Sequence, residues 1–113
     1  MRTKIFSYFR KFCIKFYFRI IITLKKRVVI KVHGTVQGVF FRASVFGKAR
    51  ELLLAGWVRN ERDGTIKAVA EGEEEKLKQL VQYCQSGPEF ANVQKLEVEW
   101  EEANGEFNEF MIR

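Results

Sequence analysis

The sequence predicts one small α+β domain in which two helices cover one face of an antiparallel sheet. Apolar and polar residues alternate in several short segments, two other segments carry apolar residues at helical spacing, and glycines separate these segments. With 113 residues, of which 47% are hydrophobic, the chain can bury one modest core. We therefore expect a domain over residues 28–113, preceded by a basic, aromatic-rich extension over residues 1–27.

The first half of this domain predicts a strand, a helix and two further strands. Val28, Ile30 and Val32 alternate with Arg27, Lys31 and His33, as in a strand with one buried face. Apolar residues recur at helical spacing over residues 42–54, and Gly56 follows as the expected helix stop. Strands are then predicted over residues 57–60 and 65–71, joined by a turn that contains glycine.

The second half predicts a helix and two more strands. The helix is expected over residues 73–86 and ends at the Gly-Pro pair 87–88. Residues 94–101 alternate as a strand with one wet face, and Asn104-Gly105 turns the chain toward a last strand at residues 110–112. The order β-α-β-β-α-β with a terminal strand predicts an α/β sandwich of the ferredoxin-like type.

The segment that says most about function is GTVQGVFFR, at residues 34–42, between the first predicted strand and the first helix. Its glycines, at 34 and 38, permit tight turns that aim successive backbone N–H groups at one anion, and the helix N-terminus adds its positive dipole end. Arg42 in the first helical turn is unfavourable unless an anion lies beside it. The segment therefore predicts an oxyanion site, and it matches neither the Walker loop nor the dinucleotide motif.

This segment resembles the acylphosphatase signature G-x-V-Q-G-V-x-F-R at every position. A second stretch, Gly56-Trp57-Val58-Arg59-Asn60 followed by Gly64-Thr65-Ile66 and Gly72, resembles the other signature of that family, with Ile66 where valine is more usual. The resemblance covers residues 28–113. It implies the same fold, the hydrolysis of acyl phosphates without a metal or other cofactor, and a phosphate-binding loop made of Val36, Gln37, Gly38, Val39, Phe40, Phe41 and Arg42.

Arg42 and Asn60 are the candidate catalytic residues. The planar guanidinium of Arg42 can donate two parallel hydrogen bonds to a phosphate. The resemblance implies that Asn60 orients the attacking water, whereas without it an asparagine that begins a hairpin turn is the simpler interpretation. An acyl phosphate leaves as a carboxylate and needs no general acid, so a site with few reactive groups suits this substrate.

Other reactive side chains have structural interpretations. His33 is the only histidine, and its place on the polar face of the first strand favours a solvated residue over a catalytic base. Arg59 is expected to be an exposed hairpin residue, although it could also widen a positive approach to the site. Cys13 and Cys84 form no metal motif, and Cys84 falls on the apolar face of a helix, so we expect a buried thiol and a cytoplasmic setting.

The net charge of +6 is unevenly distributed. Residues 1–27 hold nine of the 20 Lys and Arg residues and none of the 14 acids, so the remainder carries 11 basic against 14 acidic residues. A nucleic-acid binder would carry its basic excess on the folded surface, so we expect no nucleic-acid partner. Residues 1–27 are interpreted either as an amphipathic helix in weak contact with a membrane surface or as the product of a misassigned start, and residues 20–24 are too short an apolar run to span a membrane.

Two other functions compete with the hydrolase hypothesis. One is a phosphate- or carbamoyl-phosphate-binding module without activity of its own, as where an acylphosphatase-like domain serves inside a larger protein. The other, less favoured, is an RNA-binding ferredoxin-like domain, because the wet face of the first strand carries Arg27, Lys31 and His33 and not aromatic residues. We expect instead a monomer whose partner is a small-molecule acyl phosphate.

Overall fold

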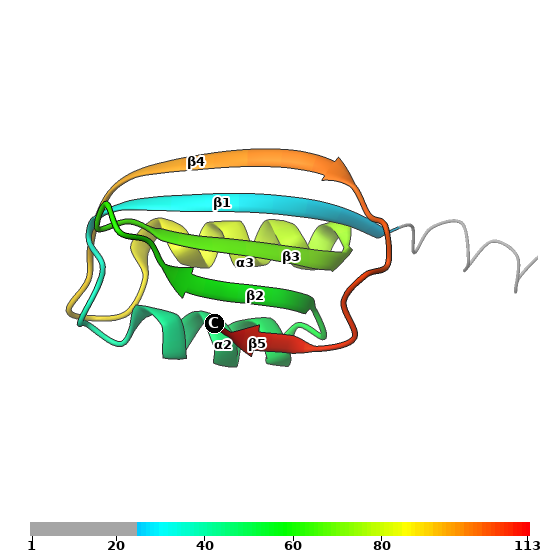
Figure 1. Cartoon of the computed structure of the whole chain (residues 1–113), viewed down its shortest axis with the longest axis horizontal. Coiled ribbons are helices and arrows are strands. Elements are labelled where there is room, and N and C mark those ends of the chain that lie inside the picture. Colours follow the sequence, from blue (N-terminus) through cyan, green and yellow to red (C-terminus); the bar gives the residue numbers. More distant parts are fainter. Residues whose placement is uncertain (1–24) are drawn as a thin grey trace, which may run out of the picture.

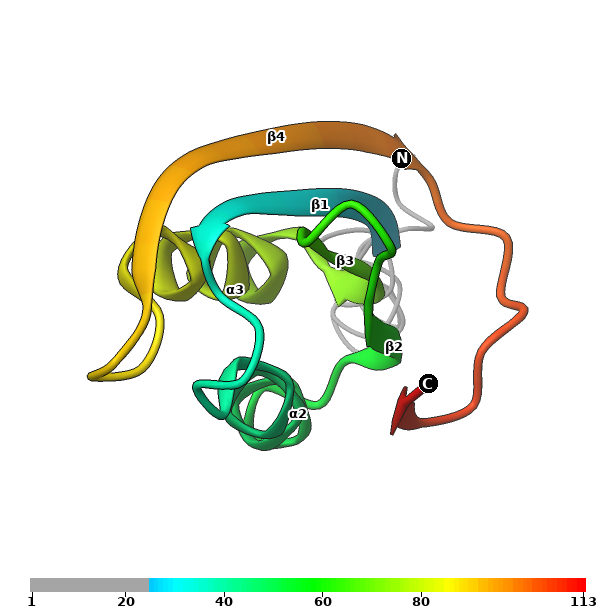
Figure 2. The ribbon, with the colours of Figure 1, turned by 60° about the vertical axis from the view of Figure 1, so that its left-hand side comes forward.

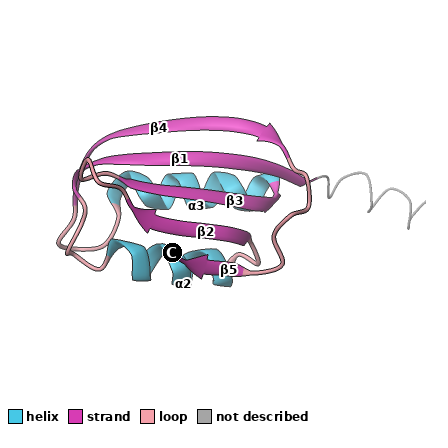
Figure 3. Ribbon diagram, in the orientation of Figure 1, coloured by secondary structure: helices cyan, strands magenta, loops and turns pink. Residues whose placement is uncertain are grey.

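The computed structural model describes residues 25–113, which form a five-stranded sheet and two helices (Figure 1). In chain order the elements are β1 (Lys25–Thr35), α2 (Phe41–Glu51), β2 (Ala55–Asn60), β3 (Ile66–Glu73), α3 (Glu74–Ser86), β4 (Asn92–Glu102) and β5 (Phe110–Ile112). Both helices lie on the same face of the sheet, behind the strands in Figure 3. The predicted ferredoxin-like α+β fold is confirmed.

The core lies between the sheet and the helices. Alternate residues of β1, namely Val28, Ile30 and Val32, are at most 1% exposed, which confirms the predicted strand period. The helices contribute their apolar faces to the same cluster, through Phe41, Val45, Ala49, Leu77, Leu80 and Cys84. Cys84 is the buried thiol that the sequence predicts, and burial raises its pKa to about 12, so it packs as a small apolar residue.

The sheet is mixed, whereas the sequence predicts an antiparallel sheet. The strand order is β4-β1-β3-β2-β5, and only the pairing of β5 with β2 is parallel. Figure 2 shows why: after β4 the chain passes around to the opposite edge of the sheet before β5 begins. Residue alternation reports that a strand has a buried face, but not which strand it pairs with, so the partner of β5 could not be predicted.

Two predicted boundaries differ from the structure at the ends of α2 and β1. The helix ends at Glu51 and not at Leu54, because Leu53 adopts a left-handed conformation with φ of 60°. Gly56, the expected helix stop, lies within β2, where a Cβ atom would sit 1.9 Å from the Val69 carbonyl oxygen. Residues 25–27, assigned to the extension, open β1. The other residues of the extension, 1–24, lie outside the described part of the chain.

Residues 103–109 connect β4 to β5 and are called the crossing segment. A buried carboxylate fastens this segment to the sheet. Glu71 of β3 is 6% exposed and accepts hydrogen bonds from Arg27 Nε at 2.7 Å and from the backbone N–H groups of Asn104 and Gly105 at 3.1 Å each. Burial alone would raise the pKa of Glu71, but these hydrogen bonds hold the pKa below its ordinary value.

Among residues 25–113, no helix is long and apolar enough to cross a membrane.

Replacing Glu71 by alanine is expected to lower the free energy of unfolding by about 2 kcal/mol, because Arg27 loses its buried partner while it keeps Glu106. The folded-state pKa of Glu71 lies below the unfolded one, so its contribution is full above about pH 4.3 and is lost as the pH falls through the folded-state pKa. Urea denaturation of both proteins at pH 7 and at acid pH measures the effect.

Glu102→Ala is the matched control, because Glu102 is 86% exposed and its pair with Lys26 is a surface ion pair. We expect it to change the free energy of unfolding by less than about 0.5 kcal/mol. Equal effects of the two substitutions, or a Glu71 effect that does not shrink in acid, would contradict this account of the crossing segment.

Candidate active site

The segment between β1 and α2, residues 36–40, forms a tight loop at one end of the sheet (Figure 1). Gly38 and Phe40 both adopt left-handed conformations, with φ of 77° and 66°. A Cβ atom at Gly38 would meet nothing within 4 Å, so glycine serves there by its backbone freedom and not by its small size. Left-handed residues within a turn direct successive N–H groups toward one concave side. We call residues 36–40, with the first turn of α2, the phosphate loop.

The N–H groups of the phosphate loop have no acceptor in the described chain. Within residues 25–113, no backbone or side-chain group accepts a hydrogen bond from the N–H groups of residues 37–43. Helix α2 also has no acidic residue in its first turn and no side-chain cap. Free N–H groups and a positive dipole end at one place are the features that an anion site requires.

Arg42 and Asn60 face one pocket of about 340 Å³, lined by Val36, Gly38, Phe40, Phe41, Arg42, Ala43, Asn60 and Ile112. Among the ion pairs and hydrogen bonds of residues 25–113, none involves the Arg42 guanidinium. The Oδ1 atom of Asn60 is buried and likewise has no partner in the described chain. An unpartnered buried amide oxygen costs about 1–3 kcal/mol, so a bound water or ligand that donates a hydrogen bond here would relieve a real penalty.

Five of the seven predicted phosphate-binding residues line this pocket, and two do not. The lining residues are Val36, Gly38, Phe40, Phe41 and Arg42. Val36 and Phe41 have buried side chains, so only their backbone groups are available to an anion. Val39 packs against the core, and Gln37 turns its side chain elsewhere.

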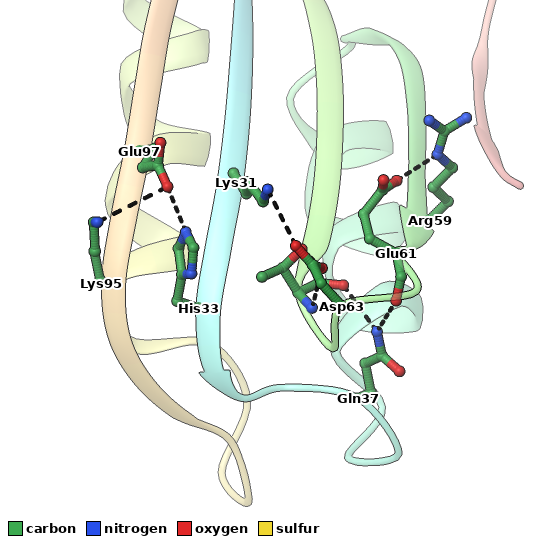
Figure 4. A network of polar contacts seen from close by, with 9 residues as sticks. Lys31, His33, Gln37, Arg59, Glu61, Asp63, Lys95 and Glu97 are labelled. Atoms are coloured by element: carbon green, nitrogen blue, oxygen red, sulfur yellow. Dashed lines mark hydrogen bonds and ion pairs between the residues drawn. The ribbon is translucent and has the colours of Figure 1, made fainter.

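The Gln37 side chain ties the phosphate loop to the turn between β2 and β3 (Figure 4). Its Nε2 donates to the carbonyl oxygens of Glu61 and Thr65 at 2.8 Å each. This turn follows Asn60 directly, so Gln37 fixes the distance between the loop and the strand end that carries Asn60. The motif predicts Gln37 as a loop residue but does not reveal this role, because the two carbonyls belong to a turn 24 or more residues away.

Asp63 closes the same turn. Its Oδ1 accepts the Thr65 hydroxyl at 2.6 Å and the Thr65 N–H at 3.0 Å. These hydrogen bonds lower the pKa of Asp63 to about 2, so the carboxylate stays ionised at neutral pH. Gly64, with φ of 90°, supplies the positive φ that the sequence predicts for this turn.

Gly34 has a different task from the one predicted for it. It lies in β1 and not in the phosphate loop, at the point where the register between β1 and β4 shifts. A Cβ atom at Gly34 would lie 2.1 Å from the Asn92 carbonyl oxygen, so glycine permits the close approach of β4. Gly38 is the glycine that shapes the loop.

His33 and Arg59 lie outside the pocket, on the sheet face away from the helices (Figure 4). His33 Nε2 is 2.6 Å from Glu97 Oε2. Arg59 donates through Nε to Glu61 at 2.6 Å, and its guanidinium lies 4.6 Å from the centre of the Trp57 ring. Both side chains are occupied by neighbours on this outer face, in contrast to Arg42.

The chain is similar to known proteins over most of the described residues. The family model described as acylphosphatase matches residues 28–112. A protein of Pelotomaculum thermopropionicum named acylphosphatase is 42% identical over 88 residues, which cover 78% of this chain and 96% of the relative. A Methylococcus capsulatus protein of the same name is 48% identical over 87 residues, covering 77% and 95%. The structure of an acylphosphatase from Coxiella burnetii aligns with a TM-score of 0.75 and 38% identity over 80% of this chain and 94% of that one.

Gln37→Leu is expected to weaken the binding of inorganic phosphate about tenfold, equivalent to about 1.4 kcal/mol, because the loop loses both hydrogen bonds to the turn. Isothermal titration calorimetry measures the affinity, and circular dichroism checks that the variant is folded. Gln79→Leu, at an exposed position of α3, is the control and should leave the affinity unchanged. A folded Gln37 variant with native phosphate affinity would show that the tie does not position the loop.

Proposed function

Because this chain belongs to the acylphosphatase family and hydrolyses acyl phosphates to a carboxylate and inorganic phosphate, we propose that Arg42, Asn60 and the phosphate loop form its catalytic site. One observation carries the proposal. Three kinds of group that have no partner among residues 25–113 occur together at one pocket: the loop N–H groups, the Arg42 guanidinium and the buried amide oxygen of Asn60. Each of these groups has the hydrogen-bonding capacity that a phosphate and its attacking water would use.

The phosphoryl group binds at the N-terminus of α2. The free N–H groups of residues 37–43 donate to phosphoryl oxygens, and Arg42 donates two parallel hydrogen bonds from its guanidinium. These donors are fixed by the backbone before the substrate arrives, so little reorganisation is needed as charge develops on the phosphoryl oxygens. The bound phosphoryl group thereby offsets the unfavourable place of Arg42 in the first helical turn.

Asn60 positions the water. Its Oδ1 accepts one hydrogen from the water and so directs a lone pair of the water oxygen at phosphorus. The new bond forms between the water oxygen and phosphorus while the bond from phosphorus to the acyl oxygen breaks, and the electron pair leaves with the carboxylate. The water proton passes to a phosphoryl oxygen.

The carboxylate leaving group makes this small set of residues sufficient. A carboxylic acid has a pKa near 4, so the departing oxygen is stable as an anion at neutral pH and needs no general acid. The proposal therefore assigns no step to a metal or another cofactor. His33, the only histidine, pairs with Glu97 outside the pocket and takes no part.

We also propose that the enzyme acts as a cytoplasmic monomer without a nucleic-acid partner. On the sheet face that an RNA-binding domain would use, Glu97 and Glu101 of β4 lie opposite Lys31 and Arg27 of β1, so acidic side chains offset the basic ones that a phosphate backbone would need. A shift of RNA mobility that depends on salt would contradict this part of the proposal.

Arg42→Ala and Asn60→Ala are each expected to lower kcat for benzoyl phosphate by about 100-fold or more, in the presence of a chelator. The two variants should differ in phosphate inhibition. Arg42→Ala should raise the inhibition constant of inorganic phosphate strongly, because it removes a phosphate ligand. Asn60→Ala should leave that constant within about threefold, because its partner is the water.

Arg50→Ala is the control, since Arg50 lies in the last turn of the same helix and is exposed. It should retain native kinetics. Near-full activity in Arg42→Ala or in Asn60→Ala would show that the assigned residue is not catalytic. Loss of native activity on adding the chelator would show that the site uses a metal.

A further inference from the structure

Two large apolar side chains at the active-site pocket remain exposed to solvent. Phe40 of the phosphate loop is 76% exposed and Ile112 of β5 is 44% exposed, and both line the pocket that holds Arg42 and Asn60. They are far apart in the sequence, and the parallel return of β5 beside β2 brings Ile112 to this end of the sheet. Convergence of apolar side chains on a pocket with a few polar groups is the usual composition of a ligand site.

Phe40 is also held in an unfavourable backbone conformation. Its φ of 66° and ψ of 20° are left-handed, which costs an L-residue with a Cβ atom stability that glycine would retain. The exposed ring gains little burial in return. Backbone strain at a residue whose side chain gains little burial is typical of functional positions, where the benefit appears only when the ligand is bound.

The residues on either side of Phe40 are turned toward the protein interior. Phe41 is 1% exposed and Val39 packs against the core. Of these three consecutive apolar side chains, only the Phe40 ring is largely exposed to solvent at the pocket. It is therefore available to contact the part of a substrate that extends beyond the phosphoryl group.

We propose that Phe40 and Ile112 bind the acyl group, and that the enzyme consequently prefers acyl phosphates with aromatic or branched apolar acyl groups over acetyl phosphate. This inference rests on the proposed function, because the phosphate loop and Arg42 must fix the phosphoryl end. The acyl group then extends from phosphorus into the remaining part of the pocket, where these two side chains lie. An aromatic acyl group can pack against the Phe40 ring, whereas an acetyl group is too small to make that contact.

The test compares kcat/KM for benzoyl phosphate with kcat/KM for acetyl phosphate. Phe40→Gly is expected to lower the benzoyl-to-acetyl ratio about tenfold, mainly through benzoyl phosphate, because an aromatic contact contributes on that scale. Ile112→Ala should lower the ratio by about two- to threefold through the loss of part of a smaller contact. Phe40→Leu should retain most of the preference.

Leu53→Gly is a closely matched control. Leu53 is also left-handed, with φ of 60°, is 88% exposed and lies beyond the other end of α2. Glycine relieves the same left-handed strain at both positions, so the two substitutions should change the stability of the protein similarly. Only the Phe40 substitution should alter the benzoyl-to-acetyl ratio of kcat/KM. Phe40→Asn, which tolerates the left-handed conformation, repeats the test with a side chain larger than glycine.

The possible outcomes separate this inference from the proposed function. A native enzyme that hydrolyses neither substrate would overturn the proposed function. A native enzyme that hydrolyses both, with an unchanged ratio in folded Phe40→Gly and Phe40→Asn, would overturn the acyl-group assignment alone. A parallel fall in both rates would also overturn it, because Phe40 would then shape the loop without contacting the acyl group.

Discussion

The proposed site depends on a row of backbone N–H groups at the start of α2 that remain free to donate hydrogen bonds to a ligand. Such groups would be capped by a side chain in most helices, and here residues 37–43 have no acceptor within the described chain. The loop is held in place by contacts on other sides. Phe41 enters the core, where the C-terminal end of α3 packs so closely that a Cβ atom at Gly87 would lie 2.4 Å from its ring. Gln37 ties the loop to the β2–β3 turn.

The two ends of the sheet serve different purposes. At the end away from the phosphate loop, Glu71 accepts hydrogen bonds from the guanidinium of Arg27 and from two backbone N–H groups, and these bonds stabilise the fold. At the phosphate-loop end, Arg42 and Asn60 keep their hydrogen-bonding capacity for other molecules. The crossing segment connects the two ends, because it is anchored at Glu71 and then delivers β5, with Ile112, to the pocket. Stability is thus supplied at a distance from the groups that must stay free.

The sequence predicted every strand and helix of the domain because alternation and helical spacing report which faces are buried. It could not predict features that depend on which backbone lies opposite. The parallel partner of β5, and the close approaches at Gly34 and Gly56, are properties of strand pairs and not of single segments. The same holds in the site. Arg42 and Asn60 are predicted as site residues from local motifs, whereas the partners of Gln37 are remote in sequence, so the motif marks this residue without revealing what it binds.

The structure also bears on the two interpretations of Asn60 that the sequence allows. An asparagine that serves a hairpin turn would use its side-chain oxygen to accept a nearby backbone N–H. In this turn Asp63 performs that task, through both the N–H and the hydroxyl of Thr65. The Oδ1 atom of Asn60 is buried, accepts no hydrogen bond from residues 25–113, and belongs to a residue that lines the same pocket as Arg42. The turn and the pocket therefore use different side chains, which favours the assignment of Asn60 to the attacking water.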